Sequence, residues 1–334
     1  MCKLSLSQFL LNAVQKKEAV TTELSPLLMD IAQACKAIAL AVSQGALQGT
    51  MGSLNSQNVQ GETQKQLDVI CNDIFIANTS KSGLVAGMVS EELADIYLPP
   101  QPSSASNQYL LLFDPLDGSS NVNVNISVGT IFSVLSCPAG ITQPQIHDFL
   151  QAGKHQICAG YALYGTSTIL VLSTGHGVNG FTLDTEAGEF YLTHPDMQIP
   201  AETQEFAINM SNYRYWPAPM QEYINECLQG ESGNRHKNFN MRWVASMVAE
   251  IHRILFRGGI FMYPADSKAP HGKLRLLYEA NPMSFIVEQA GGAASTGFQD
   301  IMEVMPTSIH QRIGVIMGSK NEALKTVSYY EQGR

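Results

Sequence analysis

Charged side chains are scarce in this chain of 334 residues, because lysine, arginine, aspartate and glutamate together make up only 15% of it. Globular proteins average about 25%. Hydrophobic residues account for 45%, so extensive apolar surface must be buried in a core or between subunits. The net charge of −9 excludes the broad basic surface of a general nucleic-acid or membrane-surface binder. We therefore expect no nucleic-acid partner and no membrane partner, and we favour an oligomer.

Paired cysteines and long apolar runs are also missing. The six cysteines show no CxxC spacing, which is typical of free thiols in a reducing compartment. No apolar run reaches the ~18 residues that span a bilayer, and the N-terminal segment lacks the long apolar region of a secretory signal. The eight histidines show no HxH or HExxH spacing, and no GxSxG, P-loop or dinucleotide motif stands in a suitable context. These absences favour a cytoplasmic protein without zinc, serine-nucleophile or dinucleotide chemistry.

Helical and extended segments alternate along the chain. The spacing of apolar residues predicts helices at residues 4–17, 25–44, 63–80, 217–229, 243–257, 277–291 and 319–330. It predicts strands at residues 84–90, 109–115, 122–135, 157–174, 180–192, 259–263 and 313–317. Residues 45–61 are rich in Gly, Ser, Asn and Gln and show little periodicity, which predicts a long loop of the kind that closes over a binding site. The proline-flanked segment 193–200 indicates a boundary between domains 1–195 and 196–334.

Two aspartates and a turn of small residues follow the strand expected from residue 109, in the run DPLDGSSN at 114–121. Pro115 has no N–H to donate to a sheet, so we expect the strand to end there, with Asp114 at its carboxyl end. Gly118, Ser119 and Ser120 offer backbone N–H groups beside Asp117. Carboxylates repel a phosphate, so these two sets of groups are compatible when divalent cations lie between them. The run therefore predicts a metal-dependent phosphate site.

A second predicted strand, at 84–90, ends in the adjacent acids Glu91 and Glu92. Sheets of α/β proteins bind ligands at the ends of their strands. Mg²⁺ prefers oxygen ligands and usually takes one or two carboxylates together with phosphate oxygens, and the Leu116 carbonyl could add another oxygen. The alternative is that each of these acids is a solvated loop residue.

Cations precede the helix expected at 277–291, where Lys273 and Arg275 lie within seven residues of Glu279. A phosphate is bound well by such cations at a helix entry. A second basic cluster contains Arg235, Lys237 and Arg242, and neutral donors are available from Asn209, Asn212, Tyr213 and Tyr263. The alternative for both clusters is solvated surface charge.

With these residues identified, the chain closely resembles the class I fructose-1,6-bisphosphatase family, within the lithium-sensitive, magnesium-dependent sugar phosphatases. The superfamily signature is the DPLDGSSN run together with Glu91-Glu92. More specific are NVQGE at 58–62, GKLRLLYEANPMSFIVEQAGG at 272–292 and PTSIHQR at 306–312. The resemblance extends over nearly the whole length. It implies a mixed α+β fold with two sheets in α-β-α-β-α layers, a homotetramer and a role in gluconeogenesis.

The resemblance also implies the residues of the site. Two or three Mg²⁺ or Mn²⁺ ions would be bound by Glu91, Glu92, Asp114, Asp117, Glu279 and the Leu116 carbonyl. The 1-phosphate of the sugar bisphosphate would lie at Asp117, Gly118, Ser119 and Ser120. The 6-phosphate and the sugar would contact Asn209, Tyr213, Tyr263, Lys273 and Arg242, the last from a neighbouring subunit. The catalytic residues would be Glu92 with Asp68, which activate a water, and Glu62 with Arg275, which hold the loop at 45–61 closed.

Two departures from the family pattern concern the substrate and the nucleotide. Trp243 stands after Arg242 where the pattern has tyrosine, and an indole N–H would have to replace a hydroxyl. In members that AMP inhibits, two cations bind the AMP phosphate, and their positions here are Gln108 and Ser136. No lysine or arginine occurs anywhere from residue 82 to residue 153. We therefore predict weak or absent AMP inhibition by the usual route.

The reaction implied is hydrolysis of the 1-phosphate of D-fructose 1,6-bisphosphate, which yields fructose 6-phosphate and phosphate. Two alternatives within the superfamily are hydrolysis of sedoheptulose 1,7-bisphosphate and hydrolysis of an inositol phosphate. A third, from another class, is a non-catalytic sugar-phosphate sensor. The full set of acids, including Glu92 and Asp68, disfavours a sensor because a sensor needs no base to activate water.

Overall fold

Two β-sheets form the framework of the protein in the computed structural model, which describes all residues except 1–2, 17–19, 51, 58–62, 101–108 and 333–334. The larger sheet has seven strands in sequential order, β3 to β9. These are β3 (Val85–Ser90), β4 (Tyr109–Asp117), β5 (Val128–Ser136), β6 (Gln156–Tyr164), β7 (Thr168–Ser173), β8 (Asn179–Asp184) and β9 (Glu189–His194). Strands β3 and β4 are parallel, and the other neighbours are antiparallel.

The smaller sheet has five strands in the order β11-β10-β12-β16-β14. They are β10 (Glu205–Ala207), β11 (Asn240–Met241), β12 (Ile260–Tyr263), β14 (Ala293–Ser295) and β16 (Val315–Gly318). Two short pairs complete the described strands: β1 (Ser53–Gln57) with β2 (Thr63–Lys65), and β13 (Leu274–Arg275) with β15 (Arg312–Ile313). The last pair brings two segments that are distant in sequence to the same edge of the molecule.

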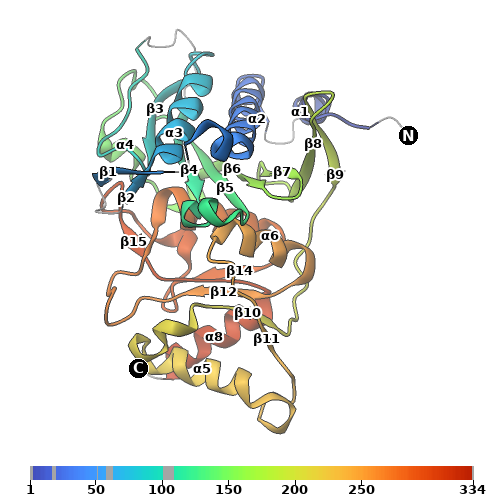
Figure 1. Ribbon diagram of the computed structural model, residues 1–334, viewed down its shortest axis with the longest axis vertical. Helices are drawn as coiled ribbons and strands as arrows, with labels where there is room; N and C mark the ends of the chain where they lie inside the picture. The colour runs from blue at the N-terminus through green and yellow to red at the C-terminus, as the bar shows by residue number, and fades with distance from the viewer. Residues whose placement is uncertain (1–2, 17–19, 51, 58–62, 101–108, 333–334) are drawn as a thin grey trace.

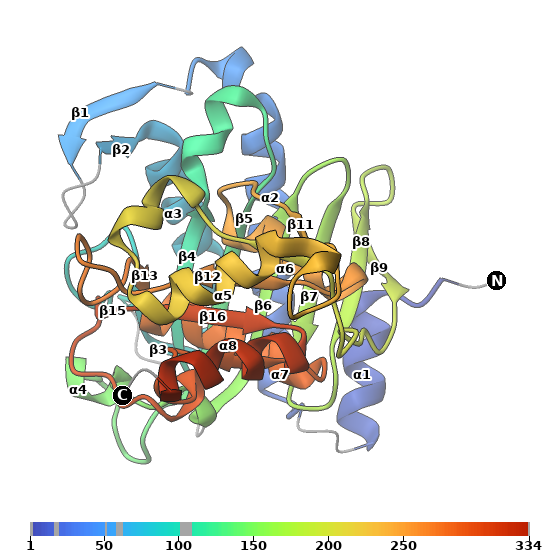
Figure 2. The ribbon, with the colours of Figure 1, turned by 90° about the horizontal axis from the view of Figure 1, so that it is seen from below.

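Helices cover both sheets and separate them (Figure 1). One outer layer contains α1 (Leu6–Lys16), α2 (Leu24–Gln48) and α3 (Gln66–Thr79). The middle layer contains α6 (Met247–Arg257) and α7 (Asn281–Gln289), which contact both sheets. The other outer layer contains α5 (Ala218–Gln229) and α8 (Lys320–Gln332), which cross the five-stranded sheet in Figure 2. The expected α-β-α-β-α layering is confirmed.

The three largest apolar cores lie between the layers: one between the outer helices α1–α3 and the seven-stranded sheet, one around the middle helices, and one under α5 and α8. The middle core joins residues of both sheets, such as Ile131 on β5 and Phe261 on β12, through α6 and α7. Strand β4 has all nine residues buried, as a central strand covered on both faces requires. The buried carboxylates at its end are therefore supported by two packed layers.

Helix α2 is, by length and composition alone, long enough and apolar enough over residues 24–45 to cross a membrane. The segment is apolar on average and contains polar residues, so it is no uninterrupted apolar run. The residues Leu27, Leu28, Ile31, Cys35 and Ile38 are nevertheless buried in the core against the seven-stranded sheet. The apolar character of α2 is that of a helix that covers a sheet.

Several element boundaries differ from the predicted ones. The loop predicted at 45–61 contains the end of α2 and strand β1, which pairs with β2, so the helix predicted from residue 63 begins at residue 66. The strand predicted from residue 122 begins at residue 128, after the short 3₁₀ helix Ser119–Val124. The helix predicted at 277–291 consists of a π-helical turn, Leu276–Ala280, followed by α7. Short strands such as β10 and β14 lack the length that a periodicity signal needs.

Candidate active site

Three buried carboxylates meet between the two sheets. Asp114 and Asp117 come from the end of β4, and Glu279 comes from the π-helical turn before α7. One ligand oxygen of each lies within 4.8 Å of those of the others, and each residue is at most 8% exposed. A π-helical turn is a frequent feature of functional sites. Residues 114 and 279 are far apart in the chain, so the fold creates this cluster.

An irregularity in β4 presents the two aspartates. The expectation that the strand ends at Pro115 is wrong: β4 continues to Asp117, and its register against β5 shifts between Asp114 and Asp117. Pro115 has no N–H to lose, and its carbonyl accepts a hydrogen bond from the Thr130 hydroxyl at 2.8 Å. The Leu116 N–H donates to the Asp114 carboxylate at 2.9 Å. The bulged segment therefore fixes the orientation of Asp114 locally.

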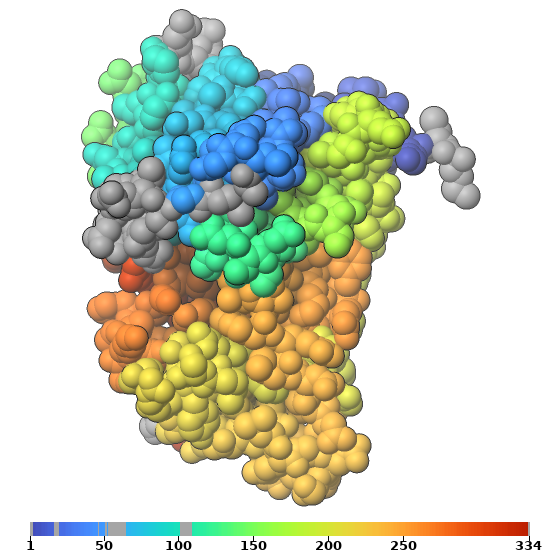
Figure 3. Space-filling model, viewed as in Figure 1, coloured from blue at the N-terminus to red at the C-terminus, as the bar shows by residue number. Residues whose placement is uncertain are grey.

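Gly118 allows the chain to turn directly after Asp117. Its φ of 77° lies in the left-handed region, and a Cβ at this position would be 2.7 Å from the Cβ of Ser246. This close approach brings the 3₁₀ helix at 119–124 against the segment before α6, where the Asn121 side chain donates to the Val244 carbonyl at 2.9 Å. In Figure 3 the part of the chain that contains this 3₁₀ helix, in green, lies next to the orange C-terminal part of the chain.

Asp117 lies at the N-terminus of α6. The Ser246 hydroxyl donates to its carboxylate at 3.0 Å, and the Val248 backbone N–H donates at 2.9 Å. Burial raises the pKa of Asp117, and these hydrogen bonds oppose that effect because they favour the ionised form. Ser246 was missed in the sequence, where its only signal is a serine directly before an apolar helix, the pattern of an N-cap.

Arg275 is the cation inside the acidic cluster. Its guanidinium lies 3.2 Å from the Glu91 carboxylate and 4.0 Å from Glu279, and its backbone N–H donates to Glu279 at 2.6 Å. Arg275 is only 5% exposed, so these interactions occur with little solvent screening. The resemblance pairs Arg275 with Glu62, which lies outside the described residues. In the part of the chain that the structure describes, Arg275 contacts two predicted metal ligands.

The carboxylates are too close together to be ionised without further cations. Burial and then the charges of Glu91, Asp117 and Glu279 raise the pKa of Asp114 well above its ordinary value. Burial raises the pKa of Glu279 to about 8, although Arg275 opposes the rise. A divalent cation with oxygen ligands would compensate for these charges. These carboxylate oxygens are ligands that suit hard cations such as Mg²⁺, and this chemical fit supports the predicted metal site.

Helix α3 packs behind the cluster. Asp68 is buried in its first turn and accepts a hydrogen bond from the Lys65 backbone N–H at 3.0 Å. Burial and then the charges of Asp68, Asp114 and Glu92 raise the pKa of the Cys71 thiol, so all three acids lie near it. The Lys65 ammonium donates to the Ser119 carbonyl at the turn. Lys65 was not recognised in the sequence, because its contact with the Ser119 carbonyl depends on the path of the chain through the β1-β2 pair.

A cavity of about 300 Å³ adjoins the acidic cluster. The predicted residues that line it are Asp117, Ser120, Asn209, Tyr263, Lys273 and Arg275. The Lys273 ammonium lies 5.8 Å from the centre of the Tyr263 ring. Asn209 precedes a 3₁₀ helix, and its side-chain oxygen accepts a hydrogen bond from the Ser211 N–H. The remaining walls include Trp243, Ser246, Met247 and Phe261, with Trp243 parallel to Phe261 at 6.2 Å. The lining thus combines one carboxylate of the cluster, Asp117, with the cations Lys273 and Arg275 and with neutral donors.

Other predicted site residues lie outside this lining. The Tyr213 hydroxyl donates to Asn225 at 3.1 Å, and Tyr213 is not among the lining residues. Arg242, which was predicted to serve a neighbouring subunit, lies 3.5 Å from Glu205 and is about half exposed. Gly118 and Ser119 form the turn beside the cavity. Glu62 and the rest of the 58–62 motif fall outside the described residues, as does Gln108.

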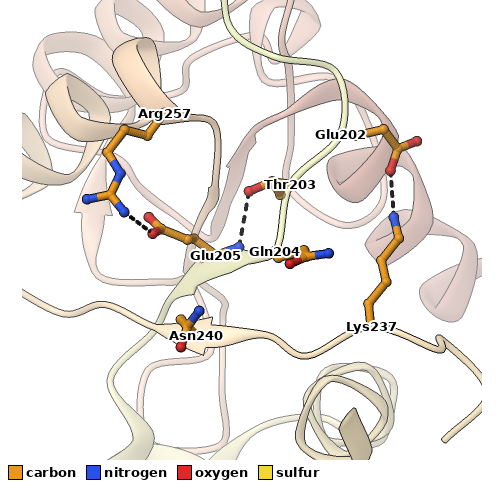
Figure 4. Close-up of a pocket in the computed structure, with 7 residues that line it drawn as sticks. All are labelled: Glu202, Thr203, Gln204, Glu205, Lys237, Asn240 and Arg257. Atoms are coloured by element: carbon orange, nitrogen blue, oxygen red, sulfur yellow. Dashed lines mark hydrogen bonds and ion pairs between the residues drawn. The ribbon is translucent and has the colours of Figure 1, made fainter. Parts of the chain in front are cut away.

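The second basic cluster of the sequence has carboxylate partners. Figure 4 shows a separate cavity of about 420 Å³ in which Lys237 pairs with Glu202 and Arg257 pairs with Glu205. Arg235 pairs with the buried Glu322, and Arg253 also pairs with Glu205. These ion pairs leave the Figure 4 cavity without an excess of positive charge among its lining residues. The interpretation as structural charge therefore fits Arg235 and Lys237 better than a phosphate site does.

Comparison with known proteins decides the family. A family model described as "Fructose-1-6-bisphosphatase, N-terminal domain" matches residues 4–195, and its C-terminal counterpart matches residues 199–331. The chain belongs to the fructose-1,6-bisphosphatase family. Two curated relatives named "Fructose-1,6-bisphosphatase class 1" come from Halorhodospira halophila, at 55% identity, and Methylobacillus flagellatus, at 56%. Each match covers 98% of this chain and 98% of the relative.

A solved structure supports the same relationship to fructose-1,6-bisphosphatase. The chain resembles the holo form of Leishmania major fructose-1,6-bisphosphatase with a TM-score of 0.92 and 37% identity. The match covers 99% of this chain and 100% of the other. The fructose-1,6-bisphosphatase family is metal-dependent and acts on a sugar bisphosphate, which agrees with the buried acidic cluster and the cavity beside it.

Proposed function

We propose that this chain hydrolyses the 1-phosphate of D-fructose 1,6-bisphosphate to give fructose 6-phosphate and phosphate, as a phosphoric monoester hydrolase of gluconeogenesis. One observation carries this proposal: a single cavity is lined by Asp117 of the acidic cluster and also by Asn209, Tyr263 and Lys273. A molecule with two phosphates matches both ends when cations accompany one phosphate. The names of the full-length relatives support the same reaction.

We assign the acidic end to two or three Mg²⁺ or Mn²⁺ ions. Their ligands would be the carboxylates of Glu91, Glu92, Asp114, Asp117 and Glu279 and the carbonyl of Leu116. Bound divalent ions supply Lewis-acid chemistry, since they lower the pKa of a ligand water and neutralise phosphoryl oxygens. The raised pKa of Glu279 supports this assignment, because burial, and to a smaller extent the charges of Glu91 and Asp117, disfavour an ionised carboxylate that a cation would stabilise.

The chain's own groups would position the substrate. Backbone N–H groups of the turn at Gly118, Ser119 and Ser120 would donate to the 1-phosphate, because the turn directly follows Asp117. Asn209, Tyr263 and Lys273 would bind the 6-phosphate and the sugar from the other end of the cavity. Arg242 would reach this end from a neighbouring copy, which its half-exposed side chain permits. Tyr213 would first have to leave Asn225.

Glu92, helped by Asp68, would accept the proton of the attacking water. The shared influence of these two acids on the Cys71 thiol supports their proximity. Glu62 and Arg275 would hold the segment before α3 over the site and exclude bulk water. In the described residues, Arg275 has the further role of neutralising Glu91 and Glu279.

The remaining assignments concern the whole protein. We propose a cytoplasmic homotetramer whose chain divides into domains 1–195 and 196–334. The low charged fraction of the sequence favours large buried interfaces. Sedimentation at working concentration would test the tetramer, with a monomer as the contradicting result.

Substrate comparison tests the reaction. Phosphate release should require Mg²⁺ and be fastest with fructose 1,6-bisphosphate, compared with sedoheptulose 1,7-bisphosphate and inositol 1-phosphate. Glu92→Gln should lower turnover by about 10²-fold or more, the range of a general base, with smaller effects on substrate binding. Preference for inositol phosphate would refute the substrate assignment. Binding without turnover would indicate a sensor.

We also propose weak or absent AMP inhibition by the usual route. Ser136 is an exposed residue at the end of β5, and the Thr21 hydroxyl is already bonded to Tyr109 and to the Leu24 N–H. Without two cations, about 1.5–3 kcal/mol per charge-assisted hydrogen bond is lost. Activity should therefore stay within twofold at millimolar AMP. Strong inhibition that survives Thr22→Trp, which would fill the loop before α2, would mean that AMP binds elsewhere.

A further inference from the structure

The segment at residues 242–246, which we call the wall segment, joins β11 to α6 and forms one side of the active-site cavity. Trp243, Ala245 and Ser246 all line that cavity. The wall segment is neither helix nor strand, and Ala245 has a φ of 61°, in the left-handed region that favours glycine. Backbone groups outside helices and sheets need other partners when they are buried. The position of Trp243 therefore depends on what holds this backbone.

Both ends of the wall segment are attached to the rest of the fold. The Arg242 N–H donates to the Phe206 carbonyl at 2.8 Å, which continues the pairing of β11 with β10. At the other end, the Ser246 hydroxyl donates to the Asp117 carboxylate at 3.0 Å. Val244, midway between these two points, is attached by side chains from two other elements.

Two buried side chains hold Val244, one on each side of its Cα. Its N–H donates to the Glu250 carboxylate at 2.6 Å, and its carbonyl accepts from the Asn121 side chain at 2.9 Å. Glu250 is 0% exposed and Asn121 is 7% exposed. Because a peptide group is planar, the two hydrogen bonds orient both peptide groups that flank Val244. One of these is shared with Trp243 and the other with Ala245.

Glu250 uses its two carboxylate oxygens separately. One accepts the Val244 N–H, and the other accepts from the Arg253 guanidinium at 3.0 Å. Arg253 has a second carboxylate partner, Glu205, at 2.5 Å. Arg253 therefore keeps an ion pair when Glu250 is changed, so substitution can separate the two roles of Glu250.

Asn121 is the last residue of the DPLDGSSN run, and the proposed hydrolysis gives it no role. Its hydrogen bond to Val244 joins two residues that are 123 positions apart in the chain. It thereby connects the turn at 118–120, where we place the 1-phosphate, with the wall segment that carries Trp243. The motif and the opposite side of the cavity are held in register by this contact.

We propose that Asn121 and Glu250 are positioning residues of the active site, which fix Trp243 as a wall beside the sugar of the substrate. They act through the two peptide groups at Val244 and are not among the residues that line the cavity. The Trp243 ring centre lies 6.1 Å from that of Tyr263, a proposed contact of the sugar and the 6-phosphate. The inference rests on the proposed hydrolysis for its substrate, but the position of Trp243 can be measured without turnover.

Fluorine NMR of the full-length protein labelled with 5-fluorotryptophan tests the positioning directly. The chain has two tryptophans, so Trp243→Phe assigns both resonances. Asn121→Ala and Glu250→Met should each shift or broaden the Trp243 resonance. The Trp216 resonance, from a buried residue outside this cavity, should stay unchanged. Glu250→Gln should leave both resonances near their parent positions, because its amide oxygen still accepts the Val244 N–H.

Steady-state kinetics with fructose 1,6-bisphosphate at saturating Mg²⁺ test the consequence for the substrate. Asn121→Ala and Glu250→Met should each raise KM by about fivefold and change kcat by less than twofold, the pattern of lost uniform binding. Both act through Val244, so KM of the double variant should rise by much less than the product of the two single effects. Glu250→Gln should stay within twofold of the parent KM.

Asn123→Ala provides the matched control, because Asn123 is an exposed residue of the same 3₁₀ helix. It should change neither the Trp243 resonance nor KM. Equal behaviour of Glu250→Gln and Glu250→Met would mean that Glu250 serves only its ion pair, and would overturn its positioning role. A parental Trp243 resonance and KM in Asn121→Ala would overturn the role of Asn121.

The fluorine spectra also separate this inference from the proposed hydrolysis. If the parent protein released no phosphate, the hydrolysis would be refuted, and the Trp243 resonance would still decide whether Asn121 and Glu250 position the wall segment. Circular dichroism verifies that each variant is folded. Asn121→Ala decides the proposal if Glu250→Met does not fold.

Discussion

Asp114, Asp117 and Glu279 are almost fully buried at the candidate active site, whereas in a second acidic group Glu288 is partly buried. Its neighbours Asp300 and Glu303 are exposed. Burial, followed by the charge of Asp300 and a hydrogen bond with it, raises the pKa of Glu288 to about 7. Lys154 lies 2.5 Å from Glu303 at the surface. Both groups concentrate carboxylates, but only the first adjoins the cavity with Asn209, Tyr263 and Lys273.

The two groups differ in how their charge is compensated. At the active site, the buried guanidinium of Arg275, the Ser246 hydroxyl and the Val248 N–H all favour ionised carboxylates. Around Glu288, solvent takes the place of such buried donors. Acidic residues close together thus indicate a metal site when they are buried among such donors beside a cavity. The charge count alone does not distinguish the two groups.

The largest difference between the groups should appear in catalysis. Asp117→Asn should reduce Mg²⁺-dependent phosphate release by about 10³-fold, because it removes a proposed metal ligand where transition-state charge is neutralised. The matched change Asp300→Asn, in the second group, should leave turnover within twofold. Steady-state phosphate release measures both. Similar losses in the two variants would contradict a special role for the first group.

The second largest difference between the two acidic groups should appear in the free energy of unfolding. Arg275→Met leaves Glu91 and Glu279 without their buried cation, so the free energy of unfolding in EDTA should fall by about 3–5 kcal/mol. Mg²⁺ should recover part of this loss, because it compensates for the same charges. Lys154→Met removes an exposed ion pair and should cost less than about 1 kcal/mol. Urea unfolding with and without Mg²⁺ provides the measurement, and equal costs would show that burial of the cluster is unimportant.

The smallest effect should be a pH dependence at the second group. The pKa of Glu288 in the folded protein, about 7, lies above the ordinary value of 4.5, so the folded state retains a proton that the unfolded state loses. Its contribution to stability is therefore present below pH 4.5 and lost as the pH rises through 7. Glu288→Gln should be more stable than the parent by about 1 kcal/mol at pH 8, a figure reduced for solvent screening. At pH 4.5 the two should be nearly equal, and a pH-independent offset in thermal unfolding would contradict this cause.

Much of the site could be predicted because many of its functional residues lie in short sequence motifs. The DPLDGSSN run and Glu91-Glu92 indicated carboxylates at strand ends, Lys273 and Asn209 were candidate phosphate-binding groups, and the resemblance added the metal-ligand role of Glu279. Ser246 and Lys65 escaped notice because each acts through one contact across the fold, with Asp117 and with the Ser119 carbonyl. Pro115 misled the strand prediction, because the bulge and the Thr130 hydroxyl accommodate it within β4.

The sequence by itself determined the family, the layered class of fold and the acids proposed for a metal site, because local patterns and motifs specify these properties. Only the tertiary structure decided which charges meet. Arg275 faces Glu91 and Glu279, and Arg235 and Lys237 have carboxylate partners elsewhere. The physical reason is that the energy of a charge depends on its distance from other charges and on its burial. Those two quantities are set by packing between layers that are distant in the chain.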